Sequence, residues 1–117
     1  MARFILLLHE SPTAFDGISA EEIQGVVEEY GAWRQKLARE DRLAGGEKLV
    51  DGAARSLATD NGRIEVSDGP FAEAKEVIGG YFMIKAGDWD EAVTISRECP
   101  HLKYGGRIEL RQIEEIH

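Results

Sequence analysis

The chain has 117 residues, of which 43% are hydrophobic, so it is long enough to bury the core of a single domain spanning residues 1–117. Its formal net charge of −8 argues against nucleic-acid binding, because duplex nucleic acid would be repelled at long range. A lone cysteine, Cys99, excludes an internal disulfide and fits a reducing compartment, where we expect it to be a small buried hydrophobe.

The N-terminal segment begins with an apolar run at residues 4–8. A signal peptide needs an apolar region of about 7–15 residues, and a membrane span needs about 20. We therefore expect a cytoplasmic protein with no membrane association.

The same run at residues 4–8 is too short for a helix and is apolar on both faces, which predicts a central strand. After a loop, Ser19 and Glu22 form a capping box that predicts a helix start. The helix should extend to about residue 42, because apolar residues recur at steps of three and four: Ile23, Val26, Tyr30, Trp33 and Leu37.

Gly25 and Gly31 interrupt this helix, each at a cost of about 1 kcal/mol relative to alanine. Close packing on a sheet or tolerance on the solvent side would each account for them. Residues 44–46 then break the helical pattern, and residues 47–50 are a candidate short strand.

A β-hairpin is the clearest local prediction. Residues 55–59 and 63–66 flank Asp60-Asn61-Gly62, and Asn-Gly accepts the positive φ values of a tight turn. Ile64 and Val66 alternate with polar residues, so the hairpin should have one buried and one solvated face.

The C-terminal half repeats the strand–helix–strand order. Residues 77–86 form a strand with a bulge or bend at Gly79-Gly80. Asp88 begins a second helix that should end at Pro100, and residues 108–112 alternate as a last strand.

This order predicts a ferredoxin-like α+β fold, a split β-α-β sandwich with an inserted β-hairpin. Two helices cover only one sheet face, whereas the first strand is apolar on both. A second copy packed face to face is the simplest cover, so we expect a homodimer.

The stretch "SDGPFAEAKEVIGGYF" at residues 67–82 concentrates backbone restriction and polarity between two strands. Pro70 fixes its own φ, and Gly69 turns without a Cβ clash, so Asp68 and Phe71 should project in fixed directions. Stiff backbone with converging polar groups predicts a small-molecule pocket. An ordinary turn, with Asp68 bonded to nearby backbone N–H groups, is the alternative.

The motif at residues 68–82 resembles the signature of the YCII-like family, in its DGPF branch. The resemblance covers nearly the whole chain, including the first strand, the Gly45-Gly46-Glu47 turn and the closing strand. It implies a ferredoxin-like fold, dimerisation as a dimeric α+β barrel, and a pocket between helix and sheet. It implies no assigned activity, although a few YCII-like proteins are dehydrochlorinase-type lyases and DGPF relatives often accompany alternative sigma factors.

A histidine–aspartate pair is the proposed active centre of the short YCII-like proteins. Its histidine lies on the first helix, where this sequence has Tyr30. The resemblance therefore carries over directly only to Asp68, the acid of the motif.

Histidine can exchange a proton near neutral pH, so each of the three histidines is a candidate. His9 ends the first strand and would be a base if Asp68 oriented it, whereas a histidine bonded to backbone is the structural alternative. His101, after Pro100, is a second candidate for the pocket wall, and His117 is expected to be solvated.

Two functions stay open. One is a ligand-binding or regulatory module, and the other is a small acid–base enzyme of lyase or isomerase type acting on a small organic molecule. The candidate catalytic residues are His9 and Asp68, and the candidate ligand-binding residues are Tyr30, Trp33, Phe71, Glu73, Lys75, Tyr81 and His101. No spacing typical of a metal or cofactor site occurs, so we expect neither.

Overall fold

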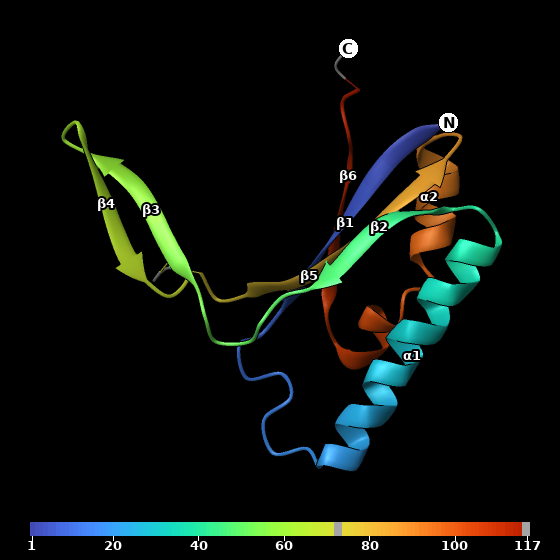
Figure 1. Ribbon diagram of the computed structural model, residues 1–117, viewed down its shortest axis with the longest axis horizontal. Helices are drawn as coiled ribbons and strands as arrows, with labels where there is room; N and C mark the ends of the chain where they lie inside the picture. Colours follow the sequence, from blue (N-terminus) through green and yellow to red (C-terminus); the bar gives the residue numbers. More distant parts are fainter. Residues whose placement is uncertain (72–73, 116–117) are drawn as a thin grey trace.

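In the computed structural model, which describes residues 1–71 and 74–115, an antiparallel four-stranded sheet carries two α-helices and a short 3-10 helix. A two-stranded hairpin stands apart from this sheet (Figure 1). The elements are β1 (Ala2–Glu10), α1 (Ala20–Arg39), β2 (Leu43–Lys48), β3 (Arg55–Asp60), β4 (Arg63–Asp68), β5 (Val77–Ala86), α2 (Trp89–Ser96), η1 (Pro100–Tyr104) and β6 (Arg107–Gln112).

The strand predicted at residues 4–8 is confirmed as the central strand β1, which pairs with β5 on one side and β6 on the other. The sheet order is β2-β5-β1-β6. Where β1 and β5 pair, the register shifts so that Leu8 opposes Gly80 and His9 opposes Ile78. Gly79 is therefore the extra residue of a bulge, as the glycine pair predicted.

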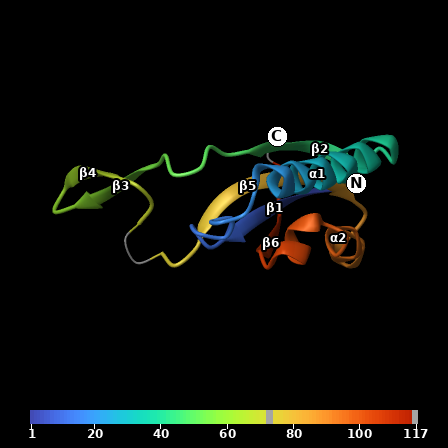
Figure 2. The same ribbon diagram turned by 90° about the horizontal axis from the view of Figure 1, so that it is seen from below.

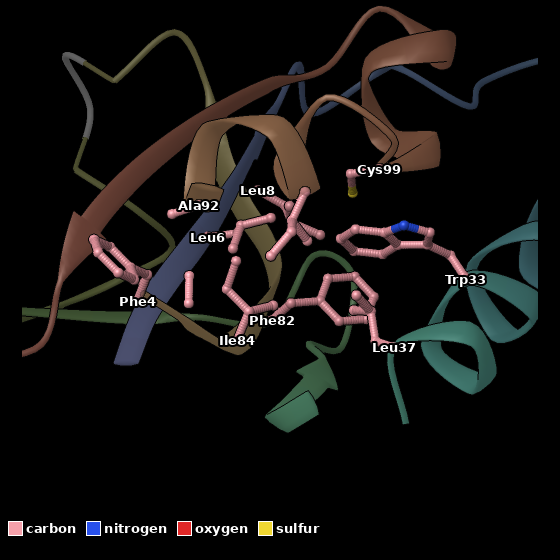
Figure 3. Packing of buried hydrophobic residues seen from close by; sticks show 11 residues of the cluster. Phe4, Leu6, Leu8, Trp33, Leu37, Phe82, Ile84, Ala92 and Cys99 are labelled. Carbon is pink, nitrogen blue, oxygen red and sulfur yellow. The ribbon is translucent and has the colours of Figure 1, made fainter. Parts of the chain in front are cut away.

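The hydrophobic core lies between the sheet and both helices (Figure 3). Alternate β1 residues Phe4, Leu6 and Leu8 are buried there, because successive side chains of a strand point to opposite faces. They pack with Trp33 and Leu37 of α1 and with these residues of β5, α2 and the following turn: Phe82, Ile84, Ala86, Ala92, Ile95 and Cys99.

Helix α1 starts as predicted, since the Ser19 hydroxyl accepts a hydrogen bond from the Glu22 amide. It ends at Arg39, three residues before the predicted end, because Asp41 adopts a left-handed φ of 55° that no α-helix continues through. In α2, Asp88 caps the first turn as predicted, but the helix stops at Ser96. Pro100 begins η1 instead of simply following a helix, which suits a residue with a fixed φ and no N–H.

The strand predicted at residues 47–50 lies earlier, as β2 at Leu43–Lys48, and contains both glycines that were expected to end the helical pattern in a turn. The reason is close packing. A Cβ on Gly46 would lie 2.9 Å from the Tyr81 carbonyl oxygen, so only glycine allows β2 to approach β5 there.

The hairpin forms around Asn61-Gly62 with φ values of 51° and 78°, as the turn chemistry predicted. The prediction that one face of the hairpin is buried is wrong in the single chain. Leu57, Ile64 and Val66 share one face of the hairpin and are exposed, because the hairpin extends away from the sheet and helices and none of the described residues covers this face (Figure 2).

Candidate functional site

A cavity of about 590 Å³ lies between α1 and the helix-covered face of the sheet, a size typical of small-molecule sites. Most of its wall is apolar, from Leu8, Phe15, Ile23, Val26, Val27 and Phe82. The other lining residues that carry a polar side chain are Glu10, Tyr30, Arg34, Glu47, Lys48, Asp51, Tyr81 and His101. Of these, Glu47 and Tyr81 pair with each other and alternate with residues facing the helices, so their side chains point to the opposite sheet face. We call this the α1 cavity.

Glycines keep the α1 cavity open. A Cβ on Gly31 of α1 would meet no atom within 4 Å, and Gly31 lines the cavity. Its small size therefore leaves empty volume, which neither explanation offered for it from the sequence anticipated. On the opposite wall, a Cβ on Gly79 would collide with the Glu10 carboxylate, so Gly79 makes room for that side chain.

A chain of hydrogen bonds borders the cavity. The Tyr30 hydroxyl lies 2.8 Å from His101 Nδ1, and His101 Nε2 lies 2.7 Å from the His9 carbonyl oxygen. His101 is 3% exposed, on η1, and a Cβ on Gly106 would collide with its imidazole ring. Gly106 thus leaves the space that the imidazole occupies.

Burial raises the pKa of two groups at this corner, the Tyr30 hydroxyl and the Cys99 thiol. Burial, with smaller contributions from nearby groups including Glu10, raises the pKa of Tyr30 well above its usual value. Burial also raises the pKa of the neighbouring Cys99 thiol to about 11. Tyr30 therefore carries its hydroxyl proton at neutral pH, and Cys99 is a buried thiol, as expected from the sequence.

Tyr30 and His101, two of the predicted ligand-binding residues, line the α1 cavity. Tyr81 is also among the lining residues, but it pairs with Leu7, so its side chain points to the sheet face opposite the helices. Trp33 lies in the core with its ring against Phe82, and its indole N–H has no hydrogen-bond partner among the described residues. Phe71 and Lys75 are exposed and are not among the cavity's lining residues, and Glu73 lies outside the described residues.

The predicted catalytic pair lies on separate parts of the chain. The His9 side chain points to the face of the sheet opposite the helices, and its Nε2 lies 3.1 Å from Glu109. Asp68 ends β4, is 90% exposed, and pairs with Arg55 across the hairpin at 3.2 Å. In the part of the chain that the structure describes, no hydrogen bond or ion pair joins His9 to Asp68.

Within the Asp68–Phe71 corner, Gly69 is hydrogen-bonded to the other arm of the hairpin. Gly69 has a φ of 85°, its amide donates to the Ala54 carbonyl, and the Ser56 hydroxyl donates to its carbonyl at 2.6 Å. These two hydrogen bonds join Gly69 to the start of β3 at the base of the hairpin, and the stiffness expected from Gly69 and Pro70 stays a prediction.

Sequence reasoning missed Glu10, Arg34 and Lys48. The Arg34 guanidinium donates to the Gly46 carbonyl at 2.8 Å and so joins α1 to β2 beside the cavity. A signal for Arg34 existed, because it lies four residues after Tyr30 and so on the same helix face. Glu10 and Lys48 carried no such signal, since their position depends on how strands end at the cavity mouth.

The antiparallel sheet covered by helices, with a cavity beneath α1, defines a small α+β domain with one principal hollow for a ligand in its described part. The YCII-related domain matches residues 2–117, and the chain therefore belongs to the YCII-related family.

The chain is also similar to two known proteins. An uncharacterised protein of Rhizobium meliloti (strain 1021) is 30% identical over 96 residues, which span 81% of this chain and 77% of that protein. A solved structure, 5-chloro-2-hydroxyhydroquinone dehydrochlorinase from Burkholderia phenoliruptrix AC1100 in complex with 2,5-dihydroxybenzoquinone, has a TM-score of 0.55 and 14% identity. That match covers 97% of this chain and 94% of the dehydrochlorinase, and at this identity the likeness shows the fold.

Within the described residues, no helix has the length and apolar character of a membrane span.

Proposed function

We propose that the chain binds a small, largely apolar organic molecule in the α1 cavity. The observation that carries this proposal is the cavity itself, which combines about 590 Å³ of space with a mostly apolar wall and a few polar groups. Such a wall favours burial of apolar ligand surface, while the polar groups orient one part of the ligand.

The test compares two glycines of the same helix. Gly31 lines the cavity, whereas Gly25 does not, and an added Cβ at either position would meet no atom within 4 Å. Gly31→Leu should fill the cavity and abolish the thermal shifts that small aromatic compounds give with the wild type. Gly25→Leu should keep those shifts. Equal shifts in both variants would mean that the compounds bind elsewhere, and the proposal would fail.

A second candidate function, a small acid–base enzyme, is favoured by one specific observation. The Tyr30–His101 pair supplies groups for proton transfer at the cavity wall, and such a pair is more than passive binding requires. A solved structure of similar fold is a dehydrochlorinase, which is compatible with elimination chemistry here.

Several finer assignments belong to the same proposal. The residues 68–71 support the DGPF branch, and the sheet order β2-β5-β1-β6 supports a split β-α-β sandwich of the ferredoxin-like kind. The composition of the chain supports a cytoplasmic location. We propose that its partners are small molecules and not nucleic acid or membranes.

We also propose a homodimer that closes as a dimeric α+β barrel. The sheet face opposite the helices, which we call the open face, carries Ile5, Leu7 and Met83, all only partly buried in a single chain. His9 lies on this open face too. A catalytic role for His9 and Asp68 would therefore require a second copy that brings an Asp68 to the open face.

A further inference from the structure

The direction of each hydrogen bond at the cavity wall follows from the chemistry of the groups. The His9 carbonyl oxygen can only accept, so His101 Nε2 must carry a proton. In a neutral imidazole the other nitrogen then accepts, and the Tyr30 hydroxyl donates to Nδ1. The His9 carbonyl thereby fixes the tautomer of His101, as a carboxylate or carbonyl does for many functional histidines.

This arrangement leaves Tyr30 with an unused acceptor. Its proton is committed to His101, and no other hydrogen bond to its oxygen occurs among the described residues. Tyr30 lines the α1 cavity and is half-buried, so the free lone pair is available to a ligand in the cavity. A ligand group that meets it must be a donor, such as a hydroxyl.

Protonation of His101 reverses this preference. With protons on both ring nitrogens, Nε2 still donates to the His9 carbonyl, while Nδ1 now donates to the Tyr30 oxygen. The Tyr30 hydroxyl proton is then free to be donated to the ligand. The two states therefore present an acceptor and a donor at the same place in the cavity.

Resting on the proposed function, we infer that Tyr30 and His101 form a proton relay for a hydroxyl-bearing ligand, a phenol or an enol, in the α1 cavity. The ligand O–H bond breaks as its proton bonds to the Tyr30 oxygen, and the Tyr30 proton moves to His101 Nδ1. The electron pair of the broken bond stays on the ligand oxygen. The products are a phenolate or enolate and an imidazolium, and the reverse path returns one proton to the ligand.

The fold supports a functional use of this relay. His101 is positioned by a 3-10 helix that begins at Pro100, and Gly106 leaves the space for its ring. The Tyr30 side chain comes from the middle of α1, so both partners are fixed by regular elements and not by loops. Tyr104, on the same 3-10 helix, instead donates its hydroxyl to Glu29 at 2.6 Å and is not among the lining residues of the α1 cavity.

The experiment uses full-length protein and two ring compounds of matched shape, 4-nitrophenol and 4-nitrotoluene. At a pH where free 4-nitrophenol is neutral, the wild type should bind it about tenfold more tightly than 4-nitrotoluene, the value of one hydrogen bond. Bound 4-nitrophenol should also show phenolate absorbance. Tyr30→Phe should lose both the preference and the absorbance while still binding 4-nitrotoluene, and Tyr104→Phe should retain both.

A readout without ligand guards against a variant that merely misfolds. Ring 15N NMR of the free protein should place the His101 proton on Nε2, with Nδ1 accepting a hydrogen bond that disappears in Tyr30→Phe. A proton on Nδ1 of the neutral ring would overturn the relay.

The remaining outcomes separate the two proposals. Equal affinity of the wild type for both compounds, or selective binding without phenolate absorbance, would overturn the relay and leave the ligand-binding function standing. If neither compound bound, or if Gly31→Leu bound both as well as the wild type, the ligand-binding function and the relay would fail together.

Discussion

At the scale of single residues, His9 makes contacts on both sides of the sheet. His9 offers its carbonyl to His101 beneath α1, while its imidazole lies on the open face beside Glu109. The side of the imidazole follows from strand geometry, because successive side chains alternate between faces and Leu8 is buried beneath the helices. His9 therefore orients the relay through its backbone.

Cys99 gives a residue-scale prediction with a defined sign. Burial raises the pKa of its thiol from 9.0 to about 11, so the folded state holds this proton more tightly than the unfolded state. Its contribution is complete below about pH 9 and is lost as the pH rises through about 11. We expect the wild type to lose about 2 kcal/mol more unfolding free energy than Cys99→Ala across this interval, measured by urea denaturation. Parallel pH profiles for the two proteins would contradict the assignment.

The sequence revealed single site residues only where a periodic pattern carried them. Tyr30 belongs to the apolar repeat of α1 and lines the cavity, yet Trp33 from the same repeat lies in the core. Residues three apart on a helix lie on the same side but point in somewhat different directions. Tertiary packing therefore decides that Tyr30, and not Trp33, lines the α1 cavity. The partnership of Tyr30 with His101, 71 positions apart, left no local signal.

At the scale of elements, local sequence signals predicted the helix starts and the tight turn. The position of β2 depends instead on how closely this strand packs against β5. Ser19, Asp88 and the Asn61-Gly62 turn act within a few residues, and each behaves as expected. From the sequence, Gly46 was expected in a turn after the helix, because the residues that crowd it belong to β5 and α1 and left no local signal. Glycine alone does not distinguish a turn from a strand that must pack closely.

Gly46→Ala should test this explanation of β2. The new Cβ would press on the Tyr81 carbonyl oxygen, a backbone atom that cannot rotate away, so we expect a loss of about 1–3 kcal/mol in unfolding free energy. Gly25→Ala is the matched control, because it meets no atom within 4 Å and should stabilise α1 by about 1 kcal/mol. Denaturant unfolding of both variants provides the comparison, and a Gly46→Ala protein as stable as the wild type would rule out close approach as the reason for the glycine.

The hairpin shows where pattern reasoning stops at the level of elements. Alternation correctly gave Leu57, Ile64 and Val66 a common face, but the prediction that this face is buried required something to cover it. In the single chain that cover is missing, and the apolar face remains in solvent. Exposed apolar faces of this kind are typical of surfaces that meet another chain.

At the scale of the whole molecule, we predict a homodimer, because a second copy would cover the apolar residues of the open face. Light scattering at micromolar concentration should give twice the chain mass of 13.0 kDa. Leu7→Arg places a charge at the centre of the open face and should shift the protein to monomer, whereas Val27→Arg on α1 should leave the dimer intact. A monomeric wild type, or a dimer indifferent to Leu7→Arg, would contradict face-to-face packing.

The central claim is that a small organic molecule binds in the α1 cavity. Its most direct test is an NMR map of the backbone amides whose signals shift when 4-nitrophenol is added. A ligand in the α1 cavity should perturb residues 23–34 of α1, residues 79–82 of β5 and His101, which together surround the hollow. Shifts confined to residues 55–71, the hairpin and its acidic corner, would contradict the claim and return the site to Asp68.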